Sequence, residues 1–259
     1  MKRSRVFENG TVSVEALIDG GGPPVAMIAA LGRPATDFDT LAQRIVDAGY
    51  TAIRPFHRGI GRSSGPMTGI SLPDLAGDVA LVIERVSTGP AVVIGHAFGQ
   101  RVVRMLATMR PDLVRGIVML AAGGKVAPER EVRIAMAGSL NPDAPEDVRR
   151  DNVRKAFFAP GNDPSAWLHG WSPRSAEMGR GVAAANAAVW WGGGKAPILL
   201  LQGLQDVVAP PDNARLLKEE FGERVDLIEI DNAGHALLPE QPELVANNVL
   251  AFLRRHHPA

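Results

Sequence analysis

The stretch Val92-Val93-Ile94-Gly95-His96-Ala97-Phe98-Gly99 decides the fold of this chain. It opens with apolar β-branched residues, as in a buried strand, and a helix-like segment follows as far as Arg110. Gly95 and Gly99 allow the strand and the helix to approach closely enough for a sharp turn. This pattern is typical of a nucleophile elbow, which holds its apex residue in a strained conformation facing a pocket. The apex here is Ala97, where an elbow carries Ser, Cys or Asp.

Short apolar runs alternate with segments of helical periodicity on both sides of this elbow. The expected strands and helices are an opening hairpin at residues 6–18, strands at 25–31, 51–54, 114–120, 197–202 and 225–230, and helices at 37–48, 72–86, 212–221 and 242–255. Such alternation predicts an α/β fold, in which a mostly parallel, twisted sheet has helices on both faces. In sheets of this kind the chemistry collects beyond the carboxyl ends of the strands.

Residues 125–194 interrupt the alternation. They show no strand pattern, and their helical patches at 129–136 and 146–158 are separated by Pro, Gly and Asn. We interpret this segment as a helical cap inserted between two parts of a core, residues 1–124 and 195–259. The segment holds all four tryptophans of the chain, which either line an aromatic pocket or anchor the cap: Trp167, Trp171, Trp190 and Trp191.

Composition excludes several classes of function. The 28 Lys and Arg balance the 28 Asp and Glu, which argues against nucleic acid or an anionic membrane surface as a main partner. The chain has no Cys, so disulfides, thiolate metal sites and a cysteine nucleophile are absent. We find no metal-ligand spacing and no G-x-G-x-x-G after a strand, and we expect neither a metal nor a nucleotide cofactor. With no apolar run of membrane-span length and no signal-peptide pattern, we expect a cytoplasmic protein.

Three positions that directly follow predicted strands suggest a catalytic constellation. They are Ala97 at the elbow, Asp206 after the strand at 197–202, and His235 after the strand at 225–230. Because parallel strands end at one edge of the sheet, we expect these side chains to meet there. The chain order of apex, acid and histidine is that of hydrolases with a G-x-S-x-G elbow.

The chain resembles the α/β-hydrolase superfamily over nearly its whole length. Residues 32–34 resemble the oxyanion loop of that family, residues 58–63 its R-G-x-G-x-S turn, and residues 234–243 its terminal G-H…Q-P-E element. Residues 125–194 lie where the family inserts a helical cap. The resemblance implies the α/β-hydrolase fold and a cap-bearing, serine hydrolase-like protein that has alanine at the elbow.

The resemblance assigns a role to each residue of the site. Asp206 is expected to orient His235, and His235 to act as a base. The backbone N–H groups of Phe98 and Arg33 are expected to face a developing oxyanion, while the Arg33 side chain is expected to be solvated. We expect a small apolar or aromatic ester, lactone or ketone as substrate, held by Leu31, His96, Trp167, Trp171 and Trp190. The oligomeric state stays open, a homodimer being one option.

The methyl group of Ala97 cannot attack a carbonyl, and losing a triad serine lowers turnover by about six orders of magnitude. Four interpretations follow. In the first, the chain is a hydrolase whose serine was replaced to trap a substrate. In the second, Ala97 is native, and His235 with Asp206 serves as a general base in hydration, lyase or cofactor-free oxygen chemistry. Alternatively, the chain is a ligand-binding pseudoenzyme, or the elbow is only a turn and His235 a structural residue.

Overall fold

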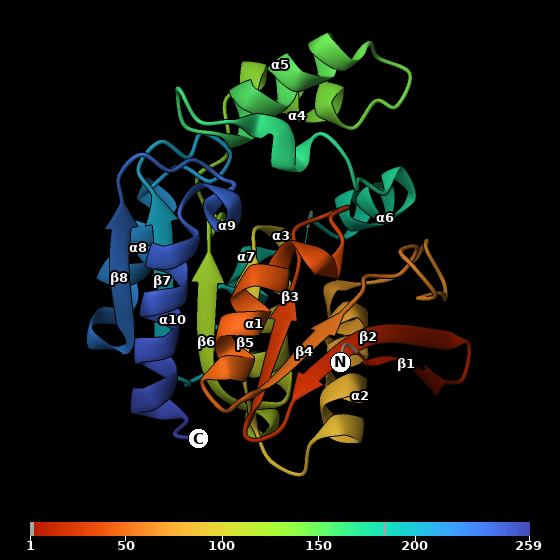
Figure 1. Ribbon diagram of the computed structural model, residues 1–259, viewed down its shortest axis with the longest axis vertical. Helices are drawn as coiled ribbons and strands as arrows, with labels where there is room; N and C mark the ends of the chain where they lie inside the picture. The colour runs from red at the N-terminus through yellow and green to blue at the C-terminus, as the bar shows by residue number, and fades with distance from the viewer. Residues whose placement is uncertain (1–2, 184) are drawn as a thin grey trace.

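The computed structural model describes residues 3–183 and 185–259, and within them the chain forms one sheet of eight strands (Figure 1). The strands lie in the order β1-β2-β4-β3-β5-β6-β7-β8. Antiparallel pairing is confined to β1 with β2 and β2 with β4, and every pair from β4 to β8 is parallel. The bounds are β1 Arg3–Asn9, β2 Val12–Gly20, β3 Pro24–Ile28, β4 Thr51–Pro55, β5 Ala91–His96, β6 Val114–Leu120, β7 Ile198–Gly203 and β8 Val225–Ile230.

Helices cover both faces of the sheet, so the predicted fold class is confirmed (Figure 1). The helices on the two faces of the core are α1 Asp39–Asp47, α2 Leu72–Val86, α3 Phe98–Met109, α8 Asp212–Phe221, α9 Leu237–Glu240 and α10 Pro242–His256. Successive side chains of β5 point to opposite faces of the sheet. Val93 packs with α2 and α3, whereas Val92 and Ile94 pack with α1 and α10. Burial on both sides explains why the central strands are apolar without alternation.

The segment predicted as a cap consists of helices joined by loops, and its described residues include no strand. Its helices are α4 Arg130–Ser139, α5 Glu146–Phe157, the 3-10 turn η3 Pro164–Trp167, α6 Pro173–Ala183 and the short α7 Ala187–Trp190. α4 and α5 lie beyond the carboxyl ends of the strands (Figure 1), where they cover the predicted site. α7 instead packs on α3 in the core. The limits of a separate cap domain therefore stay a prediction. No helix in the described ranges combines the length and the apolar character needed to cross a bilayer.

A sharp turn joins β5 to α3 at Ala97. Its φ of 50° and ψ of −113° form a strained conformation that few residues other than glycine adopt. The flanking glycines are required by close approach: a β-carbon on Gly99 would lie 2.2 Å from the Ile28 carbonyl oxygen, and one on Gly95 2.5 Å from the Gln100 nitrogen. The turn therefore has the elbow geometry that the sequence predicts, although its apex is a methyl group.

Candidate active site

His235 and Asp206, which follow β8 and β7, form a buried hydrogen-bonded pair. The Nδ1 of His235 lies 2.9 Å from Oδ2 of Asp206. The other carboxylate oxygen accepts hydrogen bonds from the backbone N–H groups of Val208 at 2.9 Å and Ala209 at 2.8 Å. Gln202 Nε2 adds a longer bond of 3.3 Å to Oδ2. The carboxylate is thus fixed from several sides, and it holds the imidazole in one orientation with its Nε2 turned away from the acid.

A cavity of about 250 Å³ brings together two of the three predicted positions, Ala97 and His235, with the first residue of α3, Phe98. Asp206 is not among the residues that line the cavity, and it is joined to the cavity through its contact with His235. The other walls of the cavity are mostly apolar and include Leu31, Met136, Leu140, Phe157, Trp167 and Trp171. Leu31, Trp167 and Trp171 therefore lie where the sequence predicts substrate contacts. Cavities of this kind, with apolar walls and few polar groups, are typical of sites for small organic molecules.

The cap supplies an aromatic wall that contacts the imidazole directly. Phe157 of α5 lies 5.9 Å from His235 between ring centroids and 5.2 Å from Trp167. Trp167 and Trp171 meet edge to face at 5.6 Å. Phe157, Met136 and Leu140 were not among the predicted substrate contacts, although Phe157 and Met136 lie in the helical patches expected at 146–158 and 129–136. Nothing in a helical pattern shows which side of a cap faces the core.

Two residues predicted to hold the substrate do not line the cavity. Trp190 is only 1% exposed and packs beside Trp191 against α3, with the guanidinium of Arg104 5.4 Å from its ring. His96 has no exposed surface and lies behind the imidazole, its Nε2–H donating to the His235 carbonyl at 2.8 Å. Because His96 is the last residue of a buried strand, it faces the interior. These positions correct the sequence-based assignment.

Arg33 also departs from the prediction. Its side chain is 2% exposed and forms two hydrogen bonds with the carboxylate of Asp37, at 2.7 and 2.8 Å. A third bond reaches the His169 carbonyl of the cap at 2.6 Å, and the guanidinium lies over the rings of Trp167 and Trp171 at 5.0 and 4.7 Å. The side chain is therefore a buried link between core and cap rather than a solvated group.

The backbone of Arg33 is engaged as well. Its N–H donates to the Ala30 carbonyl at 3.0 Å in a turn that Gly32 closes with a φ of 73°. Arg33 can serve as an oxyanion donor only if this bond breaks. The N–H of Phe98 is at the first position of α3, where a helix leaves its amides without intrahelical acceptors. Phe98 is therefore the better placed of the two predicted donors.

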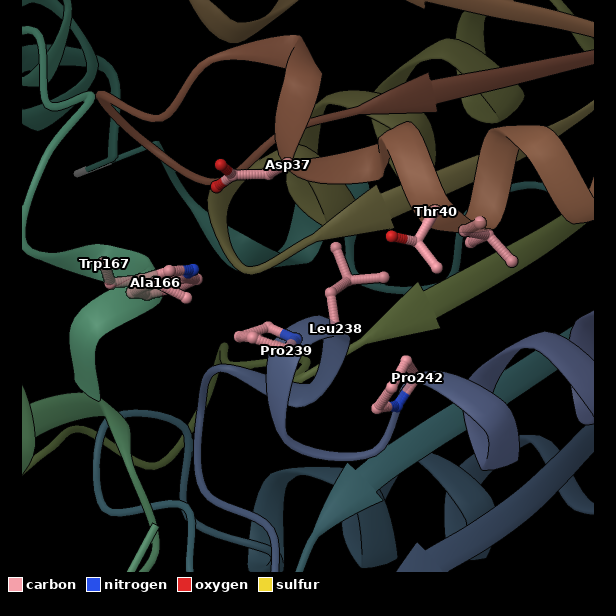
Figure 2. Close-up of a pocket in the computed structure, with 8 residues that line it drawn as sticks. Asp37, Thr40, Ala166, Trp167, Leu238, Pro239 and Pro242 are labelled. Carbon is pink, nitrogen blue, oxygen red and sulfur yellow. The ribbon is translucent and has the colours of Figure 1, made fainter. Parts of the chain in front are cut away.

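Trp167 separates the cavity from a second hollow. This hollow measures about 150 Å³ and lies between the cap and the first turns of α1, α9 and α10, with Asp37 and Thr40 on one side and Pro239 and Pro242 on another (Figure 2). Neither Ala97 nor His235 lines it. The chemistry therefore belongs to the larger cavity, on the other side of the indole.

His96 makes the folded state sensitive to acid. Burial, aided by the neighbouring His235, lowers the pKa of His96 to about 3, so its imidazole stays neutral in the folded protein. In the unfolded chain it takes up a proton near pH 6.5. The free energy of unfolding should therefore fall by about 1.4 kcal/mol per pH unit between about pH 6 and pH 3 from this group alone. Urea denaturation of the protein and of His96→Gln across this range measures the difference, and identical slopes would contradict it.

Residues 16–248 match the model of the alpha/beta hydrolase family. The chain belongs to this family. A non-heme chloroperoxidase of Streptomyces lividans is 26% identical over 90% of this chain and 92% of the relative. A 2-(acetamidomethylene)succinate hydrolase of Mesorhizobium japonicum is 32% identical over 45% of this chain, and that match spans 42% of the relative. An esterase from Exiguobacterium antarcticum has the same fold, with a TM-score of 0.78 and 17% identity over 94% of this chain and 96% of that structure.

Proposed function

We propose that this member of the family is an enzyme that uses His235 and Asp206 as a general base, without a covalent acyl-enzyme. Its substrate is a small, largely apolar or aromatic ester, lactone or ketone. One observation carries the proposal: a carboxylate-bound imidazole and the bare apex Ala97 line the same apolar cavity. The hydrolase and esterase names of its relatives support a hydrolytic reaction.

The dyad supplies the base. Asp206 accepts the Nδ1 proton of His235, which leaves Nε2 as the nitrogen that can take a proton in the cavity. For an ester, Nε2 removes a proton from a water molecule while the water oxygen bonds to the carbonyl carbon and the C=O electron pair moves to oxygen. The tetrahedral intermediate then expels the alcohol, which takes the proton back from the imidazolium.

The start of α3 stabilises the negative charge that develops in this step. The N–H of Phe98 lies next to the apex and at the positive end of a helix of 12 residues. The strained turn fixes this N–H before the substrate arrives, so that little reorganisation accompanies the reaction. Because Ala97 has no hydroxyl, the position of a serine oxygen is open to the attacking water.

Turnover of Ala97→Ser against a panel of esters, lactones and ketones tests the proposal. A serine hydroxyl would occupy the position from which the water attacks, so we expect the variant to be slower than the parent on substrates that the parent turns over. A gain of several orders of magnitude on acyl esters would show instead that the chain is a hydrolase disabled at its nucleophile. Tight binding of a panel member with no turnover in either protein would indicate a ligand-binding pseudoenzyme.

A further inference from the structure

The loop that carries His235 is bonded directly to the cap. Phe157 is the last residue of α5, so its carbonyl oxygen has no donor within the helix. The backbone N–H of Ala236 donates to this oxygen at 2.9 Å. The same peptide group is also held from the core, because its oxygen, the carbonyl of His235, accepts from Nε2 of His96 at 2.8 Å. The peptide bond next to the proposed base is therefore fixed between core and cap.

Gly234 allows the cap to approach the loop closely. A β-carbon at this position would lie 2.8 Å from the Phe157 carbonyl oxygen and 2.9 Å from the backbone nitrogen of Ala159. A side chain there would therefore push the cap away from the loop. The ring of Phe157 also lies beside the imidazole of His235. The end of α5 and the base are thus in direct contact.

The carboxylate of Glu240 joins the two sides of this contact. Glu240 is the last residue of α9, the short helix that follows His235. Its Oε2 accepts from the backbone N–H of Gly234 at 2.8 Å. Its Oε1 accepts from two groups of the cap, the backbone N–H of Ala159 at 2.7 Å and Nδ2 of Asn162 at 2.8 Å. Because hydrogen bonds to an ionised acceptor are about twice as strong as those between neutral groups, this one carboxylate ties the cap firmly to the loop.

We propose that Glu240 is a positioning residue, through which the end of α5 holds the imidazole of His235 at the place from which it acts. Its effect on catalysis rests on the proposed function, whereas the tie between cap and loop does not require turnover. A carboxylate suits this role because its three hydrogen-bond partners are all N–H donors. Glutamine would turn an NH2 group toward one of these donors and lose that bond. The loop could then move relative to the cap and to Asp206.

Amide hydrogen exchange of Glu240→Gln, followed by NMR, tests the tie without a substrate. We expect the amides of Gly234 and Ala159 to exchange at least about tenfold faster than in the wild type, because an amide has one acceptor oxygen where a carboxylate has two. Ala236 is the decisive amide. The substitution leaves its own acceptor in place, so its exchange rises only if loop and cap separate. Glu243→Gln makes the same change at an exposed ion pair and, as the matched control, should leave all three rates unchanged.

Two further measurements report on the imidazole itself. The ring carbon chemical shifts of His235 should move in Glu240→Gln and keep their wild-type values in Glu243→Gln, whether or not a substrate is known. A misplacement of about 1 Å can lower turnover about 100-fold, so kcat of Glu240→Gln should fall at least about tenfold, while Glu243→Gln stays within about twofold of the wild type. A bond that only stabilises the fold would lower the unfolding temperature and leave the shifts and kcat unchanged.

Two other variants complete the test. Asn162→Ala removes one of the cap donors of the carboxylate, and if Glu240→Gln does not fold, Asn162→Ala should still speed the exchange of Ala236. Unchanged exchange of Ala236, or unmoved ring shifts, in a folded variant would overturn the role of Glu240 and leave the general-base proposal standing. Turnover that persists in His235→Ala would instead remove the base and leave the tie between cap and loop.

Discussion

Replacing His235 by alanine is expected to lower kcat by about 10²–10⁴-fold on any substrate that the protein turns over. Because position 97 has no nucleophile, the reaction depends on the imidazole of His235, which is hydrogen-bonded to Asp206 and can take a proton from the attacking water in the cavity. KM should change little, because the imidazole acts on the water and only weakly on the bound substrate. Steady-state kinetics of the purified variant, with far-UV circular dichroism as a check of folding, measure both quantities.

His256→Ala is the matched control for this prediction. His256 is the last residue of α10, where its ring packs on Phe252 at 4.6 Å, and it does not line the cavity. Its removal should leave kcat within about twofold of the wild type, since substitutions away from the site shift energies by about 0.5 kcal/mol or less. Undiminished turnover in His235→Ala would show that the dyad is structural and would remove the basis of the proposed mechanism.

Much of the core could be predicted from the sequence because its signals are local. Continuous apolar runs mark strands that are buried on both faces, and the glycines at 95 and 99 mark a close approach of strand and helix. Since parallel strands end at one edge, the positions of Asp206 and His235 followed from the strand ends alone. The family match over residues 16–248 agrees with this interpretation.

The errors concern side chains whose partners are distant in sequence. Arg33 was expected to be solvated, yet it bonds to the His169 carbonyl, 136 residues further along the chain. Trp190 was grouped with Trp167 and Trp171 by proximity in sequence, although α7 packs on the core and the other two belong to the cap wall. A helical pattern in the sequence predicts that a helix forms. Where that helix packs depends on tertiary contacts, which the pattern does not contain.

Arg33→Met is expected to lower the free energy of unfolding by about 3–5 kcal/mol. The substitution leaves the carboxylate of Asp37 without its cation, and it also removes the hydrogen bond from the core to the His169 carbonyl of the cap. Burial already raises the pKa of Asp37 against the effect of Arg33, and the loss of the guanidinium should raise it further. Urea denaturation at pH 7 measures the loss, with Arg44→Met as a control that removes an exposed ion pair.

The pH dependence and a double variant identify the cause of this loss. In the folded variant the raised pKa of Asp37 favours the neutral carboxyl group at low pH, and the cost of burying the charged form appears as the pH rises, so the stability deficit of Arg33→Met should shrink as the pH falls below 7. Replacing both residues, as Arg33→Met with Asp37→Leu, removes the buried charge and should recover most of the stability. If the double variant is as unstable as Arg33→Met, the loss comes from the bond to the cap and from the contacts with Trp167 and Trp171, and the buried carboxylate is not its cause.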